Sequence, residues 1–148
     1  MRSQGQGAGG VFMAYVEDVF DAAMGIMDEL AAGGQALTPD TEEYAQRTPA
    51  IINALVSELK MLTGEREEWL PVESLEERVP VGDTSYALGA LPYGLAANLL
   101  IDENPSAASF YQQRYEELRA WYLARVQALS GDIANLYGGI EYGEFSAW

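Results

Sequence analysis

The chain has 148 residues, of which 8 are basic and 23 acidic, and its formal charge is −15. Such acidity repels phosphate backbones, so it argues against sequence-specific nucleic-acid binding and favours basic partners. Cysteine and histidine are both absent. Their absence excludes disulfides, thiol chemistry, zinc sites built on these residues and the usual base of serine and cysteine hydrolases. We therefore expect no cofactor, no bound metal and no enzymatic activity, with a carboxylate-only enzyme as a low-ranked alternative.

A chain of this length fits one domain, and its 49% hydrophobic content is sufficient for a buried core. Residues 1–12 are rich in glycine, glutamine and serine, and we interpret them as a disordered leader that lacks a secretion signal. Residues 84–101 form an uncharged run close to membrane-spanning length. Because acidic residues flank this run and glycines interrupt it, a buried core helix explains it better than a membrane span.

The first predicted helix covers about residues 15–32, where apolar side chains recur at helical spacing before Gly33 and Gly34. The second opens at Thr38–Pro39–Asp40, where Thr38 or Asp40 can cap the helix and Pro39 suits its first turn. Asp40 also has capping-box spacing to Glu43. Gly64 is expected to end this second helix.

Pro49 falls inside the apolar stripe of the second helix. Either the helix kinks there, or Thr48 caps a fresh start with Pro49 as its first residue. Residues 65–82 then lose the helical period and alternate prolines with acidic and apolar residues. This pattern predicts an ordered connector with a short strand or a single turn, and such long links are often functional.

The third predicted helix covers about residues 84–103 and is expected to kink at Pro92. Small residues, Gly94 among them, should allow a second helix to approach closely. Four leucines at helical spacing define its apolar face, Leu88, Leu91, Leu95 and Leu99.

The fourth predicted helix has Asn104 as its cap and Pro105 as its first residue, and it is expected to end at Gly131. Two ion pairs are expected on its solvent side, Arg114 with Glu117 and Glu116 with Arg119. Its stripe consists of Tyr111, Tyr115, Leu118, Tyr122, Val126 and Leu129. An aromatic stripe at this spacing could line a ligand groove, but it is more often core, and we interpret it as core.

The last segment, residues 132–148, combines aromatic side chains with glycines and contains no lysine or arginine. This composition is typical of a docking segment, because aromatic side chains bury a large area at interfaces. The residues expected to carry docking are Tyr137, Gly138, Gly139, Tyr142, Phe145 and Trp148. The alternative is that these aromatics pack back onto the protomer itself.

Paired glutamates recur along the chain and raise the question of metal binding or acid–base catalysis. The pairs are Glu42–Glu43, Glu67–Glu68, Glu76–Glu77 and Glu116–Glu117. Di-iron bundles require a Glu-x-x-His motif, and the sequence also lacks an EF-hand loop, a P-loop and a dinucleotide fingerprint. We therefore interpret the pairs as solvated surface, and we assign no catalytic, cofactor-binding or metal-binding residue.

Three adjoining segments carry a family resemblance. Residues 91–100 have the sequence LPYGLAANLL, residues 102–105 have DENP, and residues 110–118 have FYQQRYEEL. Small proteins of tailed-phage morphogenesis clusters have a similar alanine-rich helix followed by a similar FYQ-RYEEL helix. The shared features are packing patterns, so they are moderately specific.

Two further segments extend the resemblance to about residues 14–148. Residues 44–59 contain INALVSEL, and residues 137–142 have YGGIEY, followed by Phe145 and Trp148. Taken together, the chain resembles the head–tail connectors, or head-completion adaptors, of long-tailed phages and prophages. The leader before Met13 is not required by that pattern.

The resemblance implies a helical protomer that assembles into a homo-oligomeric ring beneath the portal, extends the DNA channel and docks the tail. It implies the portal and the tail-side proteins as partners, and a place at the head–tail junction of the virion after synthesis in the host cytoplasm. Many such connectors stay monomeric until they meet their portal. No catalytic residue is implied, and the DNA would pass through the channel without sequence-specific contact.

The predicted fold is all-α, a small helical bundle of about four main helices with an ordered connector between the second and third and an extended aromatic C-terminal tail. The predicted divisions are a leader (1–12), a helical connector domain (13–131) and a docking tail (132–148). The predicted function is that of a phage structural adaptor. An alternative from another class is a soluble acidic module that sequesters a basic protein partner.

Overall fold

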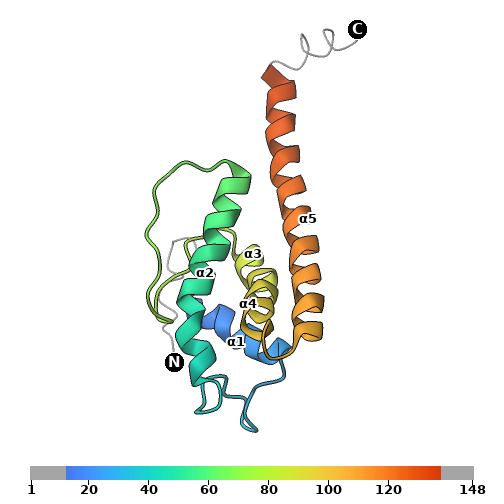
Figure 1. The fold of residues 1–148 in the computed structure, drawn as a ribbon. Coiled ribbons are helices and arrows are strands. Elements are labelled where there is room, and N and C mark those ends of the chain that lie inside the picture. The colour runs from blue at the N-terminus through green and yellow to red at the C-terminus, as the bar shows by residue number, and fades with distance from the viewer. Residues whose placement is uncertain (1–12, 138–148) are drawn as a thin grey trace.

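The computed structural model describes the backbone of residues 13–137 and the side chains of residues 13–129. Within this part of the chain there are five helices, and the predicted all-α bundle is confirmed (Figure 1). The predicted leader, residues 1–12, lies outside the described residues. The helices are α1 (Val16–Ile26), α2 (Glu42–Thr63), α3 (Thr84–Gly89), α4 (Leu91–Leu100) and α5 (Pro105–Tyr137).

Helix α4 occupies the centre of the bundle, where it contacts all four other helices. Together with α3 it lies between α2 and α5, while α1 crosses at one end of the bundle (Figure 1). At the opposite end α5 extends past the other helices (Figure 1). The largest fully buried apolar side chains around α4 are Tyr115, Phe20, Met24, Ile52, Leu91, Leu95 and Leu99.

Helix α1 ends at Ile26, so the predicted extension to residue 32 is wrong. Asp28 adopts left-handed backbone (φ 62°), and the Glu29 N–H donates to the Met24 carbonyl at 2.8 Å. Met27 still packs against the core, whereas Leu30, beyond the turn, is 45% exposed.

Helix α2 begins at Glu42 and is capped by Thr41, so the predicted capping box of Asp40 and Glu43 is wrong. Thr41 is fully buried, and its hydroxyl donates to the Ala36 carbonyl at 2.6 Å. The same hydroxyl oxygen accepts a hydrogen bond from the Thr38 N–H at 2.9 Å. Thr41 therefore fixes the loop that leads into the helix.

Pro49 lies inside α2, which is one uninterrupted helix, so the fresh start at Thr48 is excluded. The buried Thr48 hydroxyl donates to the Tyr44 carbonyl at 2.8 Å, one turn earlier. The predicted end at Gly64 is confirmed, with left-handed backbone at φ 77°. Glycine adopts this conformation without the Cβ clash that other residues meet.

The connector between α2 and α3 is ordered, as predicted, and it returns along the bundle to the start of α1. Arg78 and Tyr15 form an isolated antiparallel β-bridge. The Val16 N–H donates to the Glu77 carbonyl at 2.8 Å, which satisfies one of the free amides at the α1 N-terminus. The connector is also held to α2, because the Asn53 side chain both donates to and accepts from the Val72 backbone.

The predicted third helix is two helices, α3 and α4, which meet at Ala90. The break lies at Ala90 (φ −108°, ψ −48°), so the helix is interrupted and not merely kinked. Pro92 stands in the first turn of α4, where its missing N–H would have no carbonyl partner within the helix. Leu91, Leu95 and Leu99 are buried as predicted, whereas Leu88 on α3 is 39% exposed. Helix α4 ends at Leu100, before the predicted residue 103. Among the described residues, no helix is both long and apolar enough to span a membrane.

Helix α5 begins as predicted, since the Ala107 N–H donates to the Asn104 side chain at 3.2 Å. It does not end at Gly131 but continues to Tyr137. A single glycine inside a helix costs only about 1 kcal/mol relative to alanine, which is too little to end a long helix. The predicted stripe is buried or half-buried along most of its length, but Leu129 is exposed.

Of the two ion pairs predicted for α5, the one between Arg114 and Glu117 is confirmed and the one between Glu116 and Arg119 is wrong. Arg114 and Glu117 approach to 3.4 Å. Arg119 does not pair with Glu116, because it reaches across to Glu58 on α2 at 2.7 Å. That interhelical pair lies in a partly buried position and connects α5 to α2.

Candidate docking surface

The predicted docking residues fall almost entirely outside the described part of the chain. Tyr137 is the last residue of α5. The other five, Gly138, Gly139, Tyr142, Phe145 and Trp148, lie outside the described residues, so their docking role stays a prediction. Helix α5 runs through residue 132, where the docking tail was predicted to begin.

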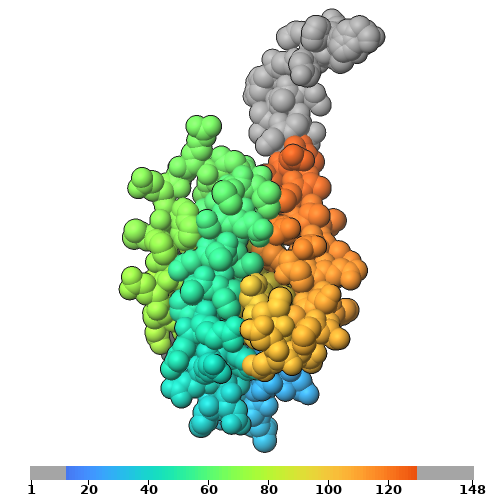
Figure 2. Space-filling view, in the orientation of Figure 1, coloured from blue at the N-terminus to red at the C-terminus, as the bar shows by residue number. Residues whose placement is uncertain are grey.

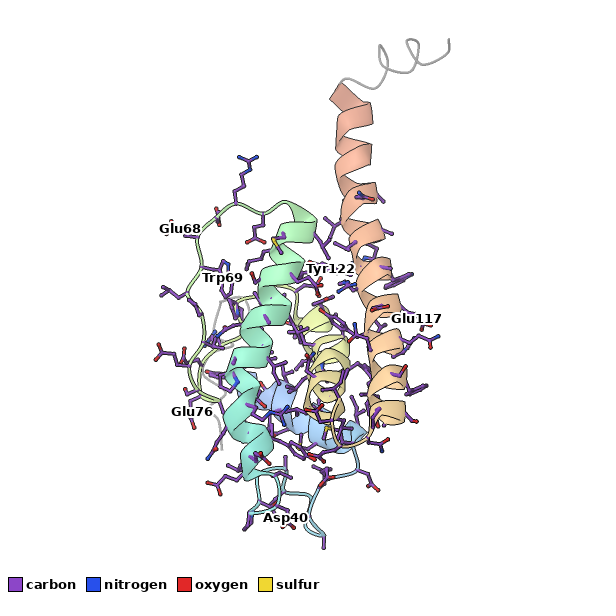
Figure 3. The ribbon with its side chains drawn as sticks, viewed as in Figure 1. Asp40, Glu68, Trp69, Glu76, Glu117 and Tyr122 are labelled. Atoms are coloured by element: carbon purple, nitrogen blue, oxygen red, sulfur yellow. The ribbon has the colours of Figure 1, made fainter. Side chains whose placement is uncertain are left out.

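Two large aromatic side chains on α5 are directed to solvent. Phe110 is 64% exposed and Trp121 is 65% exposed. They are eleven residues apart, which is about three helical turns, so they lie on the same face of the helix. Glu117 lies between them and points away from the bundle (Figure 3). We call Phe110, Arg114, Glu117, Trp121 and Arg125 the outer face of α5.

The arginines of the outer face of α5 lie against aromatic rings. The Arg125 guanidinium lies 5.7 Å from the centre of the Trp121 ring, and that of Arg114 lies 6.0 Å from the Tyr93 ring. Within the described side chains no carboxylate pairs with Arg125. Tryptophan and arginine are the residues most enriched at the energetic centres of protein interfaces. The outer face of α5 therefore has the composition of a docking surface.

The sequence did not reveal this surface, because its residues do not belong to the apolar stripe of the fourth predicted helix. Phe110 and Trp121 both lie outside that stripe. Single exposed apolar residues need no functional explanation, which is why neither attracts notice alone. The usable signal was their separation of eleven residues, which places both on one face.

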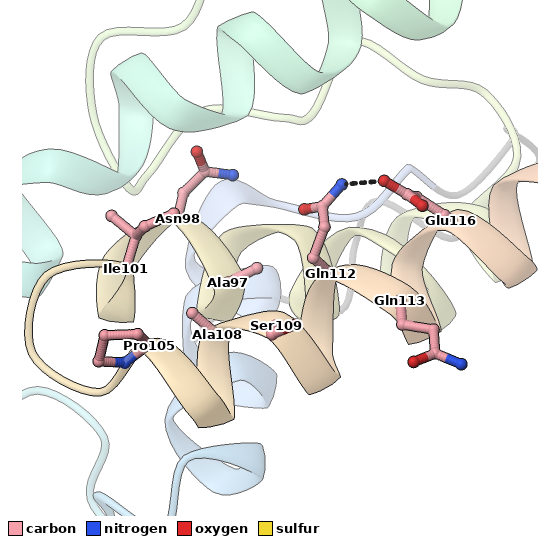
Figure 4. A pocket seen from close by; sticks show the side chains of 9 residues that line it. All are labelled: Ala97, Asn98, Ile101, Pro105, Ala108, Ser109, Gln112, Gln113 and Glu116. Atoms are coloured by element: carbon pink, nitrogen blue, oxygen red, sulfur yellow. Dashed lines mark hydrogen bonds between the residues drawn. The ribbon is translucent and has the colours of Figure 1, made fainter.

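An open groove of about 430 Å³ lies between α4 and the first turns of α5 (Figure 4). Its polar lining is mostly amides, and the Gln112 amide donates to the Glu116 carboxylate at 2.8 Å. Glu116 is the one titratable side chain among the residues that line it.

The described residues include no group of three or more carboxylates that could hold a metal ion. No family model, curated protein or solved structure matches this chain. The fold and the exposed surfaces therefore carry the functional inference.

A buried tyrosine pair lies directly behind the outer face of α5. The hydroxyls of Tyr86 on α3 and Tyr115 on α5 are hydrogen-bonded at 2.8 Å. Tyr122 packs on the Tyr86 ring, with 4.7 Å between the ring centres. Burial raises the pKa of both Tyr86 and Tyr115 above the ordinary value for tyrosine, since the charged phenolate is poorly solvated inside the bundle. The pair positions α5 against the core and is not accessible enough to act on a ligand.

We expect the protein to lose stability at alkaline pH. Burial and the hydrogen bond to Glu103 raise the pKa of Tyr44 to about 12, and the pKa values of Tyr86 and Tyr115 are also raised. Because these folded-state pKa values exceed those of the unfolded chain, the contribution to stability is complete below about pH 10 and declines above it. The free energy of unfolding should fall by up to about 1.4 kcal/mol per pH unit for each tyrosine.

The measurement is urea unfolding at a series of pH values across this range. The double variant Tyr86→Phe/Tyr115→Phe provides the control, because it removes two of the four tyrosines whose pKa is raised among the described residues, the other two being Tyr44 and Tyr122. A slope that is identical in the variant and in the wild type would contradict the assignment.

Proposed function

We propose that this chain is a structural protein of tailed phages or prophages, a head–tail connector that forms a ring beneath the portal and docks the tail. The observation that carries the proposal is the outer face of α5. A helix that presents Trp121 and Phe110 to solvent, and that extends past its own bundle, is suited to assembly with other subunits (Figure 1). The outer face of α5 is the proposed docking surface. The resemblance of the motifs to those of phage connectors is the reason for proposing a ring beneath the portal.

The motifs behind the resemblance are in contact with each other in the fold. The sequence LPYGLAANLL is helix α4, and FYQQRYEEL lies in α5. A Cβ atom at Gly94 would lie 3.1 Å from the Tyr115 ring, so the two motifs define one closely packed helix pair. This pairing supports the reading of both motifs as packing patterns of one structural unit, in keeping with an assembly protein and not with a catalytic site.

A second candidate function, an acidic module that binds a basic protein, is favoured by one observation. Residues 65–77 of the connector contain six glutamates and a single arginine. Glu68 and Glu76 project from the side of the bundle opposite to Glu117 (Figure 3). Such a surface attracts basic partners through its field.

The test is assembly with the portal protein, whose gene is expected beside that of this chain. Co-production of the two proteins, followed by electron microscopy, should show a ring of this chain on one end of the portal. If the chain stays monomeric, does not bind the portal and binds a basic protein stoichiometrically, the second candidate function is supported and the head–tail connector function is contradicted.

Removal of residues 137–148 should leave the helices folded but abolish this assembly. The core lies within residues 14–115, so the melting temperature measured by circular dichroism should be unchanged. Loss of one aromatic interface anchor typically costs about 2 kcal/mol or more of binding, and the segment contains several. Loss of the fold would show instead that the aromatics pack on the protomer, and unchanged melting with intact assembly would contradict both readings.

A further inference from the structure

The exposed surfaces of the described chain differ in charge. Residues 105–129 of α5 hold three of the eight basic residues and only two of the 23 acidic ones. The connector residues 65–77 hold six glutamates and one arginine. The net charges of the two segments are therefore opposite in sign, and a contact between the α5 segment of one copy and the connector of another is electrostatically favoured.

The acidic connector also has an apolar corner beside the end of α2. Leu70 is 84% exposed and Met61 is 73% exposed. An open hollow of about 370 Å³ lies beside Met61, and its charged lining consists of Glu65, Glu67 and Glu68 together with Lys60 and Arg66. Leu70 is not part of this lining and follows Glu68 by two residues in the sequence. We call Met61, Glu67, Glu68 and Leu70 the connector corner.

The outer face of α5 and the connector corner are on opposite sides of the bundle. Glu68 and Glu117 project in opposite directions in Figure 3, and Figure 2 shows the connector and α5 on opposite flanks. Two different, complementary surfaces on opposite flanks are what a heterologous, head-to-tail contact requires, and such contacts generate rings when the rotation closes.

We propose that the outer face of α5 of one copy packs into the connector corner of the next, with Trp121 seated in the hollow and Arg125 facing Glu67 and Glu68. This inference rests on the proposed ring, and it names the surfaces that form the ring. The contact joins an aromatic anchor with an apolar corner and places arginine opposite carboxylates.

The test uses two full-length variants that each damage one surface. The α5 variant is Trp121→Ser/Arg125→Glu, and the corner variant is Glu68→Lys/Leu70→Ser. All four side chains are exposed, so both variants should fold normally by circular dichroism. Each should weaken self-association at least about 30-fold in sedimentation equilibrium, the fold-change that corresponds to about 2 kcal/mol. Leu37→Ser, at an exposed position in the loop before α2, is the matched control and should have no effect.

Mixing the two variants decides the geometry. In a head-to-tail contact the mixture retains one intact interface per pair, so dimers should form although neither variant associates alone. If the α5 variant is monomeric and mixing restores nothing, the contact is α5-to-α5 and the proposal is overturned. A wild-type chain that associates no more strongly than either variant, whether in solution or on the portal, also overturns it. Ring formation on the portal remains the separate test of the connector function, so the two failures are distinguishable.

Discussion

Replacing Leu95 with aspartate should unfold the protein. Leu95 is fully buried on α4, the helix that contacts all the others. A carboxylate at this position has no cationic partner in the surrounding apolar core, and burying an unpaired charge costs several kcal/mol. That cost is comparable to the whole stability of a domain, about 5–15 kcal/mol. Circular dichroism should show loss of helix or a strongly lowered melting temperature.

Leu88→Asp is the matched control for this substitution. The sequence places Leu88 and Leu95 on the same apolar face, but Leu88 lies on α3, beyond the break at Ala90, and is 39% exposed. Its replacement should change the free energy of unfolding by about 1 kcal/mol or less, in the range of ordinary surface substitutions. Equal and large effects of both substitutions would mean that the helix is continuous, as the sequence alone suggested.

Local chemistry in the sequence was sufficient to predict several features of the fold. Gly64 and Asn104 act over a single turn through their own backbone or side chain, so the helix boundaries they set were predicted correctly. The connector was recognised because prolines and acidic residues interrupt the helical period there. Its return to α1 could not be predicted, because that depends on hydrogen bonds between Val16 and Glu77, which are distant in sequence.

The errors occurred where tertiary packing overrides the local pattern. Helix α1 ends at Ile26 although the apolar period continues, because Asp28 adopts left-handed backbone and the chain turns there. Arg119 was expected to pair along its own helix, but Glu58 on α2 offers a shorter contact. A sequence pattern identifies the neighbours on one helix, whereas the choice among partners depends on where the other helices lie.

The candidate docking surface was only partly predictable for a related reason. Its aromatic composition is visible in the sequence, but an exposed and a buried aromatic are distinguishable only once the position of α4 relative to α5 is known. Tyr115 and Trp121 belong to the same helix, yet the first is fully buried and the second is 65% exposed. The sequence directed attention to the C-terminal segment, while the fold identifies a second surface nearer the body of the bundle.

Gly94→Leu should destabilise the bundle strongly. The predicted close helix approach at Gly94 is confirmed, because a Cβ atom there would lie 3.0 Å from the Leu55 side chain and 3.1 Å from the Tyr115 ring. Leucine is a better helix former than glycine, which favours the variant by about 0.8–1 kcal/mol. Its side chain, however, would occupy the space in which α2 and α5 meet α4, and overpacking a core costs about 1–3 kcal/mol or more.

For leucine, the steric cost exceeds the gain in helix propensity because the two neighbouring side chains, Leu55 and Tyr115, are held in place. Tyr115 cannot retreat without breaking its buried hydrogen bond to Tyr86, and Leu55 is itself packed in the core. Urea unfolding should therefore show a net loss of up to about 2 kcal/mol, the difference between the steric cost and the gain in helix propensity. Gly89→Ala is the control, because a Cβ atom there meets nothing within 4 Å, and that variant should be neutral or slightly stabilised. If Gly94→Leu were as stable as the wild type, α4 could not lie as close to α2 and α5 as the fold requires. The close packing of the two motifs, which supports the proposed head–tail connector function, would then be contradicted.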